Sequence, residues 1–411
     1  MRVNTERTWV LADSVAKHAL IRSARQIPYI GAIALVSGLA LFASTGCGAA
    51  QSASPRTPAS PPEEVPRVVV TPNEVTDIPT LYARAAELAK NGKHLDAARA
   101  FDRVVALDER GPLAADALFQ AGAEYDLGAE LPLAAQRYEG VYRRYPQSSF
   151  ARRSLARGVR VLTHLEEWAR AGVLARSMLS FETELGPFDR ITAYSAAALD
   201  SLARDDERGA STFIERGRTL IDERGLDAAG QIPRELGALY FALGELRRRR
   251  AERIRFEPFP PNFGAVMEQR CQLLLDAQSA YSDAMRAHDA HWSTMAGVRV
   301  GELYQGLHHD LMKIRMPESA DTQEKRQLFE GALRLRYAVL LETSLKMIDH
   351  TLTMAERTGE RSTWVDRGRA VRALVNAEVR AEQAAIARLP FSKQTLQEAL
   401  DELGRRHSSP K

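Results

Sequence analysis

The sequence is poor in several features that narrow down a protein's function. Of its 411 residues only two are cysteines, Cys47 and Cys271, which is too few for a disulfide framework. Side-chain packing must therefore hold the fold together. Lys and Arg number 56 against 53 Asp and Glu, which leaves a formal charge of +3. Because proteins that bind nucleic acid usually carry a clear basic excess, this balance argues against a nucleic-acid partner.

Recognisable catalytic motifs are also missing. The sequence contains no GxxxxGK[ST], GxGxxG, HExxH or GxSxG pattern and no CxxC pair. Together these absences predict a protein that is not an enzyme, with no cofactor and no small-molecule substrate.

The N-terminal residues 1–46 have the organisation of an export signal. Five basic and two acidic residues occupy the first 26 positions, and Ile27–Ala43 then runs without a charge. A basic segment followed by an apolar one is typical of a secretory signal peptide. The alternative is an uncleaved membrane helix, although the run is shorter than the ~20 residues that a spanning helix needs. Removal of residues 1–46 leaves 51 basic and 51 acidic residues, so the mature chain is formally neutral.

A short motif and a proline-rich segment follow this signal. Residues 44–48 read STGCG and resemble the lipobox of bacterial lipoproteins, in which the signal is cut before the cysteine and the thiol is lipidated. The resemblance implies a lipidation site at Cys47, with acyl chains such as palmitate. Residues 47–79 hold seven prolines among small and polar residues. Such a segment buries too little apolar surface to order itself, so it predicts a flexible tether.

Residues 80–255 carry a sequence repeat in which apolar residues and alanines recur at helical spacings. The clearest unit contains Leu118, Gly122, Tyr125, Ala134, Tyr138, Val141 and Pro146. These residues match the tetratricopeptide (TPR) signature. Shifts of 37 residues place similar residues before and after it: Leu81, Ala85, Leu88, Gly92, Ala97 and Phe101, then Leu155, Val159, Leu162, Ala171, Ala175 and Met178. The resemblance implies an all-α fold, a right-handed solenoid of helical hairpins; an irregular helical bundle is the alternative.

A second helical region is predicted after a break. Residues 256–263 read FEPFPPNF, and their three prolines interrupt any helix. Residues 262–405 then contain long segments of helical periodicity, which predict a further, TPR-like region of long helices. Cys271 lies on the apolar face of the first of them, so we expect a core residue and not a reactive thiol.

The whole chain resembles the TPR lipoproteins of Gram-negative outer membranes. Tyr138–Ala151 is similar to repeats of outer-membrane assembly lipoproteins and of Tol-Pal coordinators, whereas the C-terminal half is loosely similar to repeat lipoproteins of gliding-motility complexes. The resemblance implies a lipid-anchored scaffold in the outer membrane that faces the periplasm and binds an envelope protein. The alternatives are an assembly or transport factor for outer-membrane protein precursors or peptidoglycan, and a metal-dependent enzyme built on the C-terminal half.

A stripe of basic residues is the main candidate for partner binding. Its members, Arg153, Arg157, Arg160 and His164, are spaced i, i+4, i+7 and i+11, which places them on one helix face. The TPR resemblance puts Arg153 and Arg160 in the concave groove, and Tyr82 and Phe119 of the first two units with them. Guanidinium groups bind carboxylates through paired hydrogen bonds, so the stripe predicts an acidic or C-terminal peptide as the ligand. The alternative is a solvated basic face neutralised by Glu166 and Glu167.

Two histidine pairs deserve comparison with metal ligands. His288 and His291 stand three residues apart, and His308 and His309 follow one segment later. Neighbouring residues on a helix point about 100° apart, so His308 and His309 do not face one ion easily. We therefore interpret these residues as solvent-exposed or helix-end histidines and predict no metal site.

Overall fold

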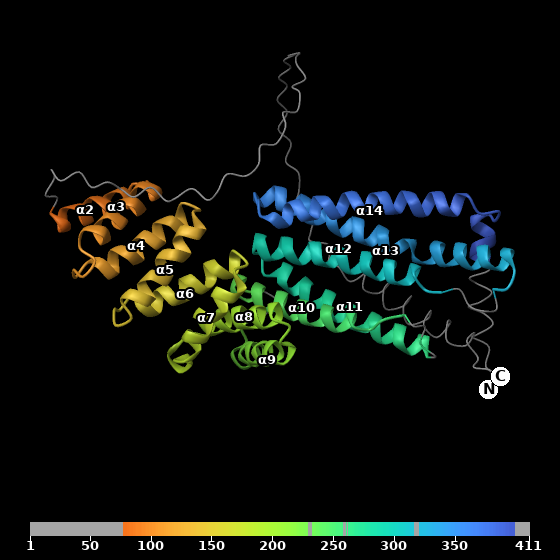
Figure 1. The fold of residues 1–411 in the computed structure, drawn as a ribbon, viewed down its shortest axis with the longest axis horizontal. Coiled ribbons are helices and arrows are strands. Elements are labelled where there is room, and N and C mark those ends of the chain that lie inside the picture. The colour runs from red at the N-terminus through yellow and green to blue at the C-terminus, as the bar shows by residue number, and fades with distance from the viewer. Residues whose placement is uncertain (1–76, 229–231, 258–259, 261, 316–319, 399–411) are drawn as a thin grey trace, which may run out of the picture.

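The computed structural model of the chain describes residues 77–228, 232–257, 260, 262–315 and 320–398, and all regular structure in these ranges is helical (Figure 1). The predicted signal peptide 1–46, Cys47 and most of the tether 47–79 lie outside the described residues. Among the helices of the described residues, none is both long and apolar enough to span a membrane. The α-helices are α2 (Ile78–Lys90), α3 (His94–Leu107), α4 (Ala114–Leu127), α5 (Leu131–Arg144), α6 (Ala151–His164), α7 (Trp168–Leu179), α8 (Pro187–Ala203), α9 (Glu207–Arg224), α10 (Gly237–Glu252), α11 (Phe263–Arg286), α12 (Ala290–Met312), α13 (Gln323–Thr358) and α14 (Thr363–Ala387).

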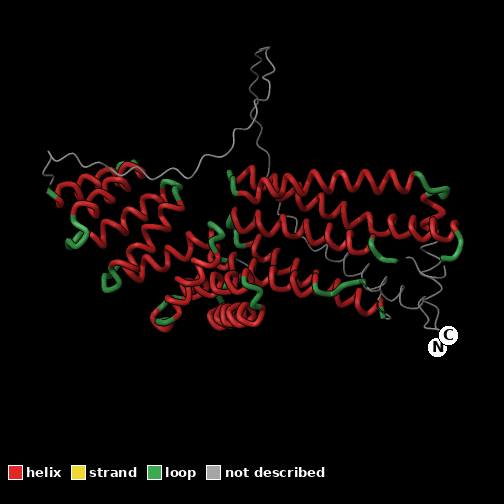
Figure 2. The backbone as a smooth tube through the Cα atoms, viewed as in Figure 1, coloured by secondary structure: helices red, strands yellow, loops and turns green. Residues whose placement is uncertain are grey.

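Consecutive helices pack as hairpins along an elongated molecule. Helix α2 packs on α3, α4 on α5, and so on to α12 on α13, while α14 packs on both α13 and α12. Short loops join most of the helices (Figure 2). The helices from α11 onward are longer than those of the first hairpins. The prediction of an all-α solenoid of hairpins followed by a region of longer helices is thereby confirmed.

The repeated small and aromatic residues explain why the first hairpins close tightly. A Cβ atom on Gly122 of α4 would lie only 2.9 Å from the Tyr138 ring of α5, so the absence of a side chain lets the two helices approach. Ala134 and Tyr138 are fully buried beside it. Every signature position of the units around Leu81, Leu118 and Leu155 that we expected to be large and apolar, apart from Leu88, is likewise buried.

The turns inside the first four hairpins share one backbone feature. Gly92, Ala129, Glu166 and Asp205 all adopt positive φ angles, of 72°, 61°, 59° and 58°. The first three are 37 residues apart. A left-handed residue reverses the chain within a short connection, which glycine does most easily. The repeat therefore extends to backbone conformation: the left-handed turn conformation is kept at Ala129, Glu166 and Asp205, where the residue is not glycine.

The first helices of the hairpins follow one another in space. From α6 onward they contact each other directly, α6 with α8, α8 with α10, α10 with α12 and α12 with α14, whereas the second helices make no comparable contacts with each other in the described ranges. Side-chain hydrogen bonds or ion pairs connect α2 to α4 through Tyr82 and Asp116, and α4 to α6 through Asp126 and Arg160. In a curved stack, the layer whose helices lie closer together is on the inside of the curve. We call the solvent side of the first helices the inner face.

Buried apolar side chains form two clusters that meet at α8. One extends from Leu81 to Ala197 and the other from Ile191 to Val375. The proline-rich segment 256–263 separates α10 from α11 as expected, yet side chains on its two sides pack together, with the rings of Phe241 and Tyr281 5.7 Å apart. The domain boundaries at 255 and 262 remain a prediction from sequence.

The inner face is covered in the second half of the molecule. Helix α10 is buried at every residue from Leu239 to Leu246. Its Phe241 ring lies 6.4 Å from that of Trp364 in α14, and its Glu245 carboxylate lies 2.8 Å from the Arg299 guanidinium of α12. Helix α8 is buried throughout Ala193–Leu202. Along the central stretches of the first helices from α2 to α10, exposed or half-buried side chains therefore lie on α2, α4 and α6.

Candidate functional site

The predicted basic stripe lies on helix α6, where it faces helix α4. Arg153 and Arg160 are exposed, Arg157 is half-buried, and the opposite face of α6 buries Leu155 and Val159 in the core. Apolar residues on one side and arginines on the other orient the helix, because burial of the arginines would cost far more than burial of the aliphatic side chains. The sequence spacing therefore does place the arginines on one surface.

Phe119 of α4 supports two of these arginines. Its ring is 2% exposed, with the Cζ atoms of Arg153 and Arg157 at 5.0 and 5.4 Å from the ring centroid and the Phe150 ring at 5.4 Å. Guanidinium groups are attracted to aromatic faces at such distances, and contact with a ring restricts their rotamers. We call Phe119, Phe150, Arg153 and Arg157 the basic-aromatic patch. Phe119 was expected to face the partner directly, but in the structure it lies beneath the guanidiniums.

The arginines of the stripe differ in their partners. Arg160 forms an ion pair with Asp126 of α4 at 3.0 Å. Arg157 donates a hydrogen bond of 3.3 Å to the Tyr138 hydroxyl. Within the described part of the chain, neither Arg153 nor Arg157 has a carboxylate partner. The patch therefore carries two positive charges that its neighbours leave uncompensated.

The acidic residues expected to neutralise this face do not do so. Glu166 accepts a hydrogen bond of 2.7 Å from the indole nitrogen of Trp364. Glu167 is exposed at the start of α7 and has no ion pair with the stripe among the described residues.

The stripe ends at a contact between distant parts of the chain. The His164 ring stacks on that of His291 at the start of α12, with centroids 3.9 Å apart. Burial, and after it the neighbouring His291, lowers the pKa of His164. His164 thus joins the hairpin α6–α7 to the C-terminal half and is less available to a partner than the arginines.

Tyr82 occupies a different part of the inner face. Its hydroxyl donates a hydrogen bond of 2.7 Å to Asp116 of α4, and its ring packs edge-on against Phe101 at 5.2 Å. Burial and the hydrogen bond to Asp116 raise the pKa of Tyr82. The structure brings Phe119, Arg153 and Arg157 together, whereas Tyr82 lies apart from them and is hydrogen-bonded to Asp116.

Two carboxylates on this surface were missed from sequence, Asp116 and Asp126. A signal was present for one of them, because Asp116 stands 37 residues before Arg153 and so occupies the equivalent repeat position. Asp126 has no such relation to Arg160; only the packing of α4 on α6 shows that they pair.

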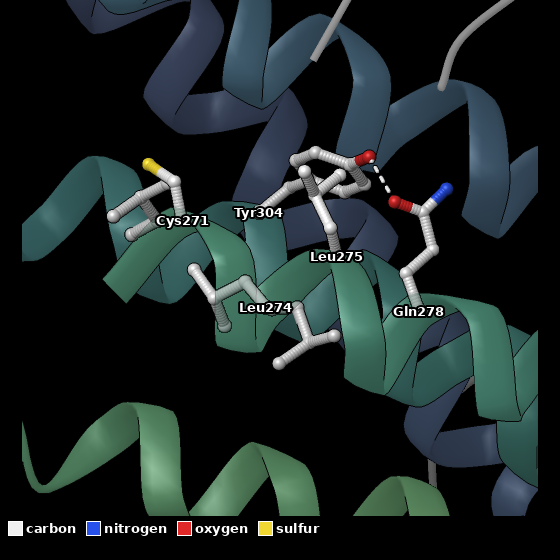
Figure 3. Close-up of a pocket in the computed structure, with 7 residues that line it drawn as sticks. Cys271, Leu274, Leu275, Gln278 and Tyr304 are labelled. Atoms are coloured by element: carbon white, nitrogen blue, oxygen red, sulfur yellow. Dashed lines mark hydrogen bonds between the residues drawn. The ribbon is translucent and has the colours of Figure 1, made fainter. Parts of the chain in front are cut away.

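Cys271 and two cavities are the other features of the described chain to be compared with a reactive site. Cys271 is buried, which raises the pKa of its thiol to about 12 and confirms it as a core residue. It lines a small apolar cavity of about 10 Å³, beside which Tyr304 donates a hydrogen bond of 2.6 Å to Gln278 (Figure 3). A larger cleft of about 530 Å³ lies between the end of α13 and the first half of α14. It is lined by Asp349 of α13 and Arg372 of α14, which form an ion pair at 2.6 Å.

The histidine pairs are distributed over separate contacts. His291 and His308 are 3% and 2% exposed, so neither is solvent-exposed; His291 is a helix-end histidine, at the second position of α12, whereas His308 is a buried residue within that helix. His291 packs on His164, whereas the His308 ring lies 3.9 Å from Glu382 and His309 lies 3.0 Å from Glu378. The described residues contain no group of three or more His, Cys, Asp or Glu side chains placed to hold a metal ion.

Comparison with known proteins adds little to this geometry. No family model matches the sequence, and no curated protein matches it. Among solved structures, the chain is similar to a tetratricopeptide repeat protein from Parabacteroides merdae, with 11% identity and a TM-score of 0.38 over 72% of this chain and 98% of that one. A likeness of this extent assigns the chain to no family, and its function has to be argued from the basic-aromatic patch itself.

Proposed function

We propose that this protein is a non-catalytic scaffold that binds an acidic segment of a protein partner on the inner face of helices α4 and α6. The observation that carries the proposal is the pair Arg153 and Arg157, held over Phe119 without a carboxylate partner among the described residues. A bound carboxylate supplies the missing negative charge.

The patch suits such a ligand for physical reasons. Guanidinium groups bind carboxylates through two parallel hydrogen bonds, and charge-assisted bonds are about twice as strong as neutral ones. Packing on Phe119 limits the rotamers of both side chains, so less conformational entropy is lost on binding. Several helices form one rigid surface, which favours an extended protein segment over a small molecule.

We further propose that the protein is exported and anchored by a lipid at Cys47 in the outer membrane, facing the periplasm, within an envelope complex. The support is the basic and apolar order of residues 1–46 and the STGCG motif at residues 44–48. The proline-rich residues 48–79 then serve as the spacer between the membrane surface and the helices.

Charge reversal tests the patch. We expect the double variant Arg153→Glu and Arg157→Glu to lower capture of the partner by about tenfold or more, because at least one charge-assisted contact worth roughly 1.5–3 kcal/mol is lost. The measurement is crosslinking in cells followed by quantitative mass spectrometry of the proteins co-purified with the chain.

The matched control is Arg143→Glu, since Arg143 is also exposed and without an ion pair among the described residues but lies on the second-layer helix α5. It should leave capture unchanged, and circular dichroism should show equal helix content in all variants. Undiminished capture by the double variant contradicts the proposal.

Lipid anchoring is tested at the cysteine. We expect Cys47→Ala to move the protein from the membrane fraction to the soluble periplasmic fraction, because one acyl chain or more supplies the membrane affinity. Mass spectrometry of the wild-type N-terminus should show cleavage before Cys47 and an acylated thiol. An intact Met1 or an unmodified Cys47 would refute the anchor while leaving the helical scaffold untouched.

A further inference from the structure

Asp116 presents a second charge on the inner face. It lies on α4, half-buried, and accepts a hydrogen bond of 2.7 Å from the Tyr82 hydroxyl and one of 3.1 Å from the Gln120 amide. Both donors are neutral, and no cation pairs with Asp116 among the residues described. The two hydrogen bonds hold the carboxylate in place without cancelling its charge.

The contrast with Asp126 shows that this is a distinct arrangement. Asp126 lies on the same helix and is neutralised by Arg160 at 3.0 Å. Of the two carboxylates that α4 contributes to the inner face, only Asp116 is therefore free to attract a cation.

Asp116 and Arg153 are equivalent positions of consecutive repeats. They are 37 residues apart, the period that also separates Gly122 from Val159 and Ala134 from Ala171. Along the stack the same place thus carries a negative charge in one hairpin and a positive charge in the next. Packed helices lie on the order of 10 Å apart, and an extended chain advances about 3.3 Å per residue. One repeat therefore matches about three residues of an extended ligand, and this is the upper limit for the two charges, because the Arg153 guanidinium extends over Phe119 of α4.

We propose that the bound segment is dipolar, with a basic side chain facing Asp116 and an acidic group facing Arg153, at most about three residues apart. This proposal rests on the function proposed above and adds the spacing and the chain direction of the ligand. The two opposite charges recognise one order of the ligand charges along the chain, since the reversed order places like charges together.

The test uses the purified full chain and an array of twelve-residue peptides. Each peptide carries one Lys and one Glu in a background of Ser, Gly and Ala, at separations of one to seven residues and in both orders. We expect the strongest retention at a separation of about three residues or fewer, with one order favoured over the other by about fivefold, the scale of an exposed ion pair.

Three variants separate the two charges. Asp116→Asn keeps an acceptor oxygen for Tyr82 and should abolish the contribution of the peptide Lys but not that of the Glu. The double swap Asp116→Arg with Arg153→Asp should reverse the favoured order. Asp126→Asn is the control, because Asp126 is already paired with Arg160, and it should leave the order preference unchanged.

The outcomes distinguish this inference from the proposed function. If peptides bind through Glu alone, and neither the position of Lys nor Asp116→Asn alters retention, the dipolar ligand is refuted while the acidic-segment scaffold stands. If no peptide is retained and crosslinked partners are insensitive to Arg153→Glu, both proposals fall. A reversed order preference in the double swap supports both.

Discussion

Replacing Glu245 with alanine is expected to lower the free energy of unfolding by about 3–5 kcal/mol, the usual cost of removing one partner from a buried ion pair. Glu245 of α10 is 6% exposed. Its carboxylate accepts hydrogen bonds from Tyr281 at 2.6 Å and Arg248 at 2.8 Å, and lies 2.8 Å from Arg299 Nε. The variant leaves a buried hydroxyl and two largely buried guanidiniums without this acceptor.

The control is Glu252→Ala, which removes the other carboxylate bound to Arg248, at 2.6 Å. The Glu252 side chain is 43% exposed, so solvent compensates its loss and we expect a cost of at most about 1 kcal/mol. Urea denaturation followed by circular dichroism measures both. Equal losses of unfolding free energy in the two variants would contradict the expectation that burial makes the Glu245 ion pairs more costly to break than the exposed Glu252 pair.

The effect of Glu245 should also depend on pH. Burial disfavours the charged carboxylate, but Arg299 and Arg248 outweigh it and place the pKa below its ordinary value. A carboxyl group with a lower pKa in the folded state stabilises fully above its unfolded pKa of about 4.3 and loses this contribution as the pH falls through its folded pKa. The stability gap between wild type and Glu245→Ala should therefore narrow in acid.

Replacing Tyr138 with alanine is expected to lower the free energy of unfolding by about 3–5 kcal/mol, the range for loss of a buried aromatic ring. Tyr138 of α5 is fully buried. It packs beside Gly122 of α4 and Gly158 of α6, and its hydroxyl accepts the hydrogen bond from Arg157. A cavity at this position loosens three helices and one of the arginines of the basic-aromatic patch.

Two substitutions isolate the contribution of the ring. Tyr142→Ala removes a ring one turn away on the same helix that is only half-buried, and should cost clearly less than Tyr138→Ala. Tyr138→Phe keeps the ring and loses only the bond to Arg157, for a cost of about 1 kcal/mol. The same urea measurement applies, and a Tyr138→Ala loss no larger than that of Tyr142→Ala contradicts the packing role.

The repeat register was readable because it follows from local geometry. Ala134 recurs 37 residues away on both sides, as Ala97 and Ala171, and Phe101 stands at the position equivalent to Tyr138, since each hairpin has the same packing problem between two helices. The prediction of helical hairpins needed only this periodicity. The long helices after residue 262, and Cys271 as a core residue, were predicted from the apolar face of each helix, which also depends only on residues a few positions apart.

The candidate site was predicted only in part. One helix period places Arg153, Arg157 and Arg160 together, so the stripe required no knowledge of the fold. The interaction partners of these arginines could be known only from the fold. Arg160 forms an ion pair with Asp126 of another helix, whereas Arg153 stacks on Phe119. Partners that lie 34 residues apart in the chain are not visible in a helix pattern.

Sequence periodicity alone thus established the class of fold, the hairpin register and the basic face of α6, because all three depend on neighbours a few residues or one repeat away. Which charges remain uncompensated, and where the inner face stays open, depended on long-range packing. Trp364 of α14 reaches back to Glu166, 198 residues earlier, and to Phe241. Such contacts cover the inner face of α10, whereas the charges on α4 and α6 stay open to a partner. Long-range contacts of this kind arise from the curvature of the whole stack and not from any single repeat.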